Sequence, residues 1–274
     1  MKTSLSSLLL AATLPLAAAV LPAAAHAFDA AAVAAASRDL QSAVNHGDLA
    51  AMLAVRARFA ALSAAEPDAA ILHDWVAVAT WRALPLETSK DRKLAEKLGD
   101  DAIAHAGKAL ASDPKDAEAL AILGGLQGLM TGIRPADMMT LGPQSGANLA
   151  RAAALAPANP RVALLQGIGD LHKPAQFGGG PEVALPDFRR AQELYAKAAP
   201  ADSTAPDWGR DDAFLWEGQA LARMNEWEKA RDAYRHALEA NPANGWVRSA
   251  LLPEAEKKLA AAKAGADARE AQVK

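Results

Sequence analysis

The sequence contains no cysteine, and only 5% of its 274 residues are aromatic. Without cysteine the chain can form no disulfide, no thiolate metal site and no cysteine nucleophile, and it offers no thiol for a lipid anchor. A net charge of -3 gives no basic surface, so we expect no nucleic-acid partner. The chain is nevertheless 51% hydrophobic, mostly in small and aliphatic residues, which is enough to bury a helical core.

The first 27 residues have the pattern of a cleavable signal peptide. Lys2 precedes an apolar run over residues 8–21, and Ala25-His26-Ala27 forms a small-x-small cleavage site. The run is short for a membrane span of ~20 residues and contains Pro15, and no later stretch is longer and more apolar. We therefore predict cleavage after Ala27, and a periplasmic protein without membrane insertion or a lipid anchor.

Residues 213–242 predict two amphipathic helices joined by a tight turn. Gly218 on the first helix is followed by Ala230, Tyr234 and Ala237 on the second, which ends at Pro242. Small residues at these positions allow two helices to approach closely, and the aromatic ring fills the remaining gap. Similar second-helix patterns recur upstream at Ala184-Phe188-Ala191, Ser145-Leu149-Ala152, Ala102-Ala106-Ala109 and Val55-Phe59-Leu62.

This spacing resembles the tetratricopeptide (TPR) repeat. Strings within residues 157–253, such as Pro160-Arg161-Val162, Phe177-Gly178-Gly179-Gly180 and Pro206-Asp207-Trp208-Gly209, further resemble a family of exported bacterial TPR proteins. The resemblance implies an all-α repeat fold and a non-enzymatic role. We predict a TPR-like α-solenoid of about five helix pairs over residues 28–253, followed by a charged C-terminal capping helix and tail over residues 254–274.

The repeats are longer than the usual ~34 residues, and the extra residues lie between the first and second helix of a pair. We expect lengthened connections at residues 84–93, 131–146 and 173–182, with Phe177 buried where the last two meet. The three glycines that follow Phe177 have two interpretations. They either present backbone N–H groups to an anion or simply let the loop pack beside its own helices, and the second is favoured because no phosphate-loop motif follows.

Catalytic motifs are absent from the sequence. Asp101 and His105, four positions apart on one expected helix, can present two metal ligands, but a surface hydrogen bond between them is favoured because no third ligand is near. Neither H-E-x-x-H nor G-x-S-x-G occurs. We expect a non-catalytic protein without a cofactor.

The expected function is that of a scaffold that binds a protein or peptide partner on the concave, first-helix face of the solenoid. One alternative is a small-molecule-binding accessory protein of a transport system, and a hydrolase is a third. An open groove favours a partner, a deep apolar pocket favours a small molecule, and a histidine-carboxylate cluster favours an enzyme. The candidate partner-binding residues, from first helices and from two loops, are Trp75, Trp81, Gln166, Asp170, Phe177, Trp208, Phe214 and Glu217.

Overall fold

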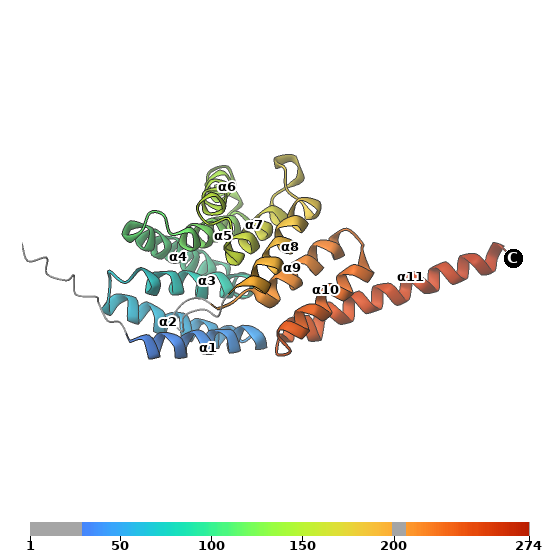
Figure 1. The fold of residues 1–274 in the computed structure, drawn as a ribbon, viewed down its shortest axis with the longest axis horizontal. Helices are drawn as coiled ribbons and strands as arrows, with labels where there is room; N and C mark the ends of the chain where they lie inside the picture. The colour runs from blue at the N-terminus through green and yellow to red at the C-terminus, as the bar shows by residue number, and fades with distance from the viewer. Residues whose placement is uncertain (1–28, 199–206, 274) are drawn as a thin grey trace, which may run out of the picture.

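The computed structural model describes residues 29–198 and 207–273, which form eleven α-helices and no strand (Figure 1). The predicted signal peptide lies outside these residues. The α-helices are α1 (Ala30–His46), α2 (Leu49–Ala65), α3 (Ala70–Lys90), α4 (Arg92–Ser112), α5 (Ala117–Ile133), α6 (Met138–Leu155), α7 (Pro160–His172), α8 (Pro181–Lys197), α9 (Arg210–Arg223), α10 (Trp227–Ala240) and α11 (Leu252–Val273). Two 3-10 turns, η1 (Pro135–Asp137) and η2 (Ala175–Phe177), and one π-helical turn, η3 (Val247–Leu251), complete the order.

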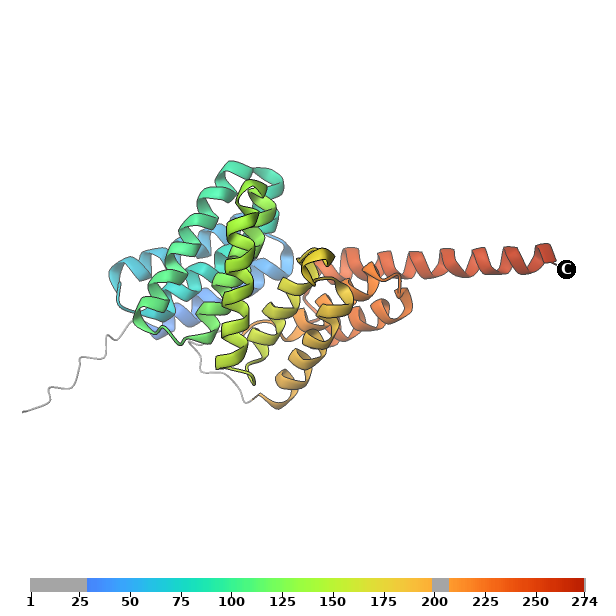
Figure 2. The same ribbon diagram turned by 90° about the horizontal axis from the view of Figure 1, so that it is seen from above.

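The helices pack as five successive pairs, from α1 with α2 to α9 with α10, and each pair stacks on the next. This confirms the prediction of an all-α, TPR-like solenoid of about five helix pairs. Helix α11 follows the last pair; it packs against α10 at its start, and the rest projects away from the body (Figures 1 and 2). Among the described residues, no helix has the length and apolar character that a membrane span requires.

The small residues predicted for the first helices lie where the paired helices touch. A Cβ added to Gly218 of α9 would lie 2.3 Å from Cε1 of Tyr234 on α10. A Cβ added to Gly167 of α7 would lie 2.7 Å from the Phe188 ring of α8. Because ordinary contacts begin at 3.4 Å, only glycine fits at these crossings. The repeat spacing read from the sequence therefore corresponds to helix packing in space.

The expected long loops at residues 84–93 and 131–146 are wrong. Helix α3 continues through Pro85 to Lys90, and α6 contains Gly142, Pro143 and Gly146. A proline inside a helix removes one backbone hydrogen bond, and in α3 the buried side chains of Leu84 and Glu87 on either side of Pro85 hold the helical path. The extra residues therefore lengthen helices in the second and third pairs, and a loop forms only in the fourth pair, between α7 and α8.

The expected burial of Phe177 is also wrong, because its side chain is 59% exposed. The glycines that follow serve the loop itself. Gly178 and Gly180 have φ of 77° and 126°, and a Cβ on Gly179 would lie 2.1 Å from the carbonyl oxygen of Lys173. Their N–H groups donate to carbonyl oxygens of residues 170, 174 and 175. This arrangement supports the packing interpretation of the glycines over the anion-binding one.

The first and last pairs of the solenoid meet. Asn241, after α10, donates from Nδ2 to Oδ1 of Asn45 in α1 at 2.9 Å. Gly245 lies against the same turn, where an added Cβ would be 2.6 Å from the Asn45 carbonyl oxygen. A second long-range link is a buried ion pair between Arg82 of α3 and Asp212 of α9. The end of the array thus touches its first helix at the turn around Asn45, and its last pair is also linked to the second pair.

Candidate functional site

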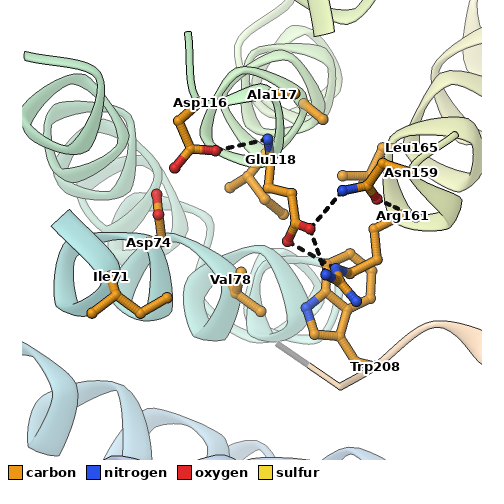
Figure 3. A pocket seen from close by; sticks show the side chains of 12 residues that line it. Ile71, Asp74, Val78, Asp116, Ala117, Glu118, Asn159, Arg161, Leu165 and Trp208 are labelled. Carbon is orange, nitrogen blue, oxygen red and sulfur yellow. Dashed lines mark hydrogen bonds and ion pairs between the residues drawn. The ribbon is translucent and has the colours of Figure 1, made fainter. Parts of the chain in front are cut away.

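A cavity of about 350 Å³ lies between α3, α5 and α7, the first helices of three consecutive pairs (Figure 3). Three carboxylates line it, from Asp74, Asp116 and Glu118, together with the polar side chains of Asn159 and Arg161. The rest of the wall is apolar and includes Ile71, Val78, Leu165 and Trp208. A cavity with an apolar wall and a few convergent polar groups is typical of a ligand-binding site.

The repeat itself places four of the polar residues. Asp116 and Asn159 lie two positions after the proline that closes the preceding repeat, and Glu118 and Arg161 lie four positions after it. Asp116 caps α5 by accepting hydrogen bonds from the backbone N–H groups of residues 118 and 119, and Asn159 caps α7 in the same way. Capping fixes these helix starts, and residues of the first helical turn of each line the cavity.

Glu118 and Arg161 form an ion pair across two repeats. Arg161 donates from Nε to Oε2 of Glu118 at 2.8 Å and from Nη2 to Oε1, and Asn159 Nδ2 donates to Oε1 at 2.7 Å. Burial lowers the pKa of the Arg161 guanidinium, but the hydrogen bonds and charge of Glu118 outweigh this and leave it raised overall. The pair is therefore ionised and internally neutral.

Asp74 has no such partner. Its side chain is on α3, is only 7% exposed and points toward the carboxylate of Asp116 (Figure 3). Oδ1 of Asp74 is buried and has no hydrogen-bond partner among the described residues. Burial raises the pKa of the Asp74 carboxyl well above its ordinary value, and the charges of Asp116 and Glu118 raise it further. The cavity therefore contains a buried carboxyl group that no cation of the described chain stabilises in its ionised form.

Trp208 reaches the cavity from the segment before α9. Its ring lies 5.5 Å from that of Trp81, between centroids, and the Arg82 guanidinium is 4.8 Å from its centroid. The backbone carbonyl of Trp208 accepts a hydrogen bond from the Tyr195 hydroxyl at 2.8 Å. The indole Nε1, by contrast, is buried and donates to no acceptor within the described part of the chain. The cavity wall thus holds an unused hydrogen-bond donor as well as the unused acceptor of Asp74.

Of the eight candidate residues named from the sequence, Trp208 alone lines this cavity. Trp81 does not line the cavity but packs against the ring of Trp208. Trp75 is 3% exposed and stacks on Phe59 at 5.2 Å, so it belongs to the core. Asp170 is also buried, where it accepts from Gln166 at 2.6 Å. The structure therefore does not bring these residues together in one surface.

The three remaining candidates lie elsewhere on the molecule. Phe214 packs beside His236, with ring centroids 5.7 Å apart. Glu217 pairs with Arg189 at 2.9 Å, and its other oxygen accepts from Gln192. Phe177 is exposed in the α7–α8 loop. Their contact with a partner stays a prediction.

The carboxylates, Asn159 and the role of Arg161 were not predicted from the sequence. A signal was present, because capping residues and charged residues recur at fixed distances after the repeat prolines. Asp74 is a second signal, since it is the one charged residue in the otherwise mostly apolar stretch from residue 70 to residue 81. The aromatic candidates include Trp208, which lines the cavity, and Trp81, which packs on Trp208, but the polar residues of the wall were not among the candidates.

The histidine and carboxylate pair singled out earlier lies on the outside of this site. Asp101 forms an ion pair with Arg56, and its Oδ2 is 3.8 Å from Nε2 of His105. Nδ1 of His105 is instead 2.8 Å from Nδ1 of His73. The described residues contain no group of three or more potential ligands placed to hold a metal ion.

Comparisons with known proteins agree on the architecture. No family model and no curated protein matches the sequence. The structure is similar to the HusA haemophore from Porphyromonas gingivalis, with 25% identity and a TM-score of 0.61 over 72% of this chain and 94% of that one. It is also similar to TTC0263, a TPR protein of Thermus thermophilus, with 15% identity and a TM-score of 0.55 over 82% of this chain and 98% of that one. The paired helices, the repeat spacing and these likenesses identify the chain as a TPR-like α-solenoid protein.

Proposed function

We propose that the protein is a non-catalytic, periplasmic binding or scaffold protein that holds a protein or peptide partner along α3, α5 and α7. The observation that supports this is the cavity spanning three repeats, in which Asp74 Oδ1 and Trp208 Nε1 are buried without partners. A buried polar group without a hydrogen bond costs roughly 1–3 kcal/mol. A partner that satisfies both atoms recovers that cost on binding.

The periplasmic part of the proposal rests on the N-terminal sequence. The charged Lys2, the apolar run and the Ala25-His26-Ala27 site are the features that export machinery uses. Expression in a Gram-negative host, followed by cell fractionation and N-terminal sequencing, tests it. The expected result is a periplasmic protein that begins at Phe28, and a cytoplasmic protein that retains Lys2 would contradict the proposal.

Selection from a displayed library of random peptides tests the binding function. The purified protein serves as bait beside two variants, Ile71→Trp, which adds bulk to the cavity wall, and Ile103→Trp, a matched change at a half-buried position on α4. We expect enriched peptides to bind the protein and the Ile103→Trp variant, and to bind Ile71→Trp at least tenfold more weakly. No enrichment, or equal binding to all three, would refute a partner site at this cavity.

A small-molecule-binding accessory protein of a transport system is the second candidate. The similarity to a protein described as a haemophore favours it, and the cavity volume is within the range of small-ligand pockets. Against haem itself, the propionate groups would meet the carboxyl groups of Asp74 and Asp116, and none of the described histidines lines the cavity. Titration with haemin, followed by absorbance, decides the point. A saturable 1:1 shift of the Soret band would favour this candidate over the peptide partner.

A further inference from the structure

The charges of the cavity do not cancel. Glu118 and Arg161 neutralise each other, and the charge of Asp116 is partly offset by the N-terminus of α5, which it caps. Asp74 has neither a cation nor a helix terminus to offset a charge, so burial favours its protonated form until a ligand enters. With Asp74 ionised the cavity is net negative, and a cationic ligand stabilises that ionised form.

An anionic ligand is disfavoured for a second reason. The N-termini of α5 and α7 point toward the cavity, and helix N-termini commonly bind anions through their free N–H groups. Here Asp116 and Asn159 already accept hydrogen bonds from the first-turn N–H groups of their helices. An incoming anion would find these N–H groups occupied and a carboxylate beside them.

Two buried atoms define which hydrogen bonds a ligand of the cavity would form, in addition to its charge. Asp74 Oδ1 needs a donor, and Trp208 Nε1 needs an acceptor. Trp208 packs on Trp81, which lies seven residues, or about 10 Å along the helix axis, beyond Asp74 on α3. Between them the wall offers apolar side chains, including Val78. A ligand that fits has a cationic donor, an apolar stem and a hydrogen-bond acceptor, in that order.

We propose that the cavity binds the side chain of a lysine or arginine residue in a partner peptide. The ammonium or guanidinium group donates to Asp74, the methylene stem packs on Ile71 and Val78, and the main-chain carbonyl of the same residue accepts from Trp208 Nε1. A free amine supplies the donor and the stem but lacks the acceptor, which is why a peptide residue is favoured. This inference rests on the proposed function and names the chemistry of the partner.

Blocked amino acids are the probes for this proposal. The N-acetyl, N-methylamide derivatives of lysine, arginine and norleucine, together with n-pentylamine, are titrated into the purified protein and followed by amide chemical shifts. We expect the lysine or arginine derivative to bind at least tenfold more tightly than the norleucine derivative, which lacks the charge, and more tightly than pentylamine, which lacks the carbonyl. A tenfold ratio corresponds to about 1.4 kcal/mol, the size expected for one charge-assisted hydrogen bond.

Three variants locate the binding. Asp74→Asn should weaken binding of the lysine derivative at least tenfold, whereas Glu193→Gln, which makes the same carboxyl-to-amide change at an exposed position of α8, should leave binding unchanged. Trp208→Phe keeps an aromatic ring but removes the N–H donor. In this variant the affinity for the lysine derivative should fall to that for pentylamine, and the affinity for pentylamine should not change. Equal loss in Asp74→Asn and Glu193→Gln would show a general charge effect and overturn the assignment.

The peptide selection separates the failure of this inference from the failure of the proposed function. Selected peptides that need the cavity but contain no common lysine or arginine would leave the proposed function standing and overturn the cation assignment. Pentylamine that binds as tightly as the lysine derivative would overturn the peptide source and indicate a free amine. Peptides with a basic residue whose binding is lost in Asp74→Asn support both proposals.

Discussion

Replacing Gly218 with alanine tests whether the small residue of the repeat is required by packing. Gly218 is buried in the middle of α9, and an added Cβ would lie 2.3 Å from Cε1 and 2.5 Å from Cδ1 of Tyr234. The ring has little room to move, because Tyr234 is itself only 2% exposed. The methyl group can be accommodated only if α9 and α10 separate.

The expected magnitude is the difference between two effects. Overpacking of a core typically costs about 1–3 kcal/mol, whereas alanine is favoured over glycine by roughly 1 kcal/mol in a helix interior. We therefore expect a net loss of up to about 2 kcal/mol in the free energy of unfolding. For a chain of this size that loss lowers the melting temperature by up to roughly 8 °C.

Gly107→Ala is the matched control. Gly107 is exposed in the interior of α4, and a Cβ there would meet no atom within 4 Å. Helix propensity then acts alone, and the variant should gain about 0.5–1 kcal/mol. Urea denaturation followed by circular dichroism at 222 nm measures both variants. If Gly218→Ala proves as stable as Gly107→Ala, the helix crossing is not tight and the packing argument is wrong.

Three further predictions concern the core, the loop and the cavity. Ala230→Leu at the same crossing should lose about 1–3 kcal/mol, because Ala230 is fully buried; an unchanged melting temperature would contradict the assigned repeat. Phe177→Ala should lose well under the ~3–5 kcal/mol of a buried phenylalanine, and weaker binding of selected peptides with little loss of stability would indicate a recognition role. Asp74→Asn should stabilise the unliganded protein at pH 7. Folding raises the pKa of Asp74, so the native state retains a proton that the unfolded state loses. The stability of the unchanged protein therefore falls as the pH rises from 3.8 through the folded-state pKa, and the variant avoids this loss. The gain should therefore vanish near pH 3.5, and urea midpoints that differ equally at both pH values would refute it.

Local spacing predicted the helix pairs because each pair is a contact between residues close in sequence. Gly167 with Phe188 and Gly218 with Tyr234 are partners within one repeat, so a short sequence pattern records them. The loop predictions failed for a different reason. Pro85 and Pro143 are usual signs of a break in a helix, yet both lie inside helices; at Pro85 the burial of Leu84 and Glu87 outweighs the lost hydrogen bond, and burial is not visible in local sequence.

The cavity could not be predicted because it depends on how the repeats stack. Asp74, Glu118 and Arg161 come from three repeats, and Trp208 comes from a segment between the fourth and fifth pairs. Their meeting point follows from the curvature of the solenoid, which no pattern within a single repeat specifies. What a sequence can supply is the list of equivalent positions after each repeat proline, and reading those positions as one surface would have recovered most of the polar wall.

The contact between the first and last pairs changes how the chain gains and loses its structure. In an open array each repeat depends only on its neighbours, so folding can begin anywhere and the ends can melt separately. Here the Asn45–Asn241 and Arg82–Asp212 contacts join residues 196 and 130 positions apart. Such contacts form late, after the intervening repeats are ordered, because closing a long loop carries an entropic cost. We therefore expect loss of the last pair to weaken the first two pairs, so that the ends melt together more than in an open array.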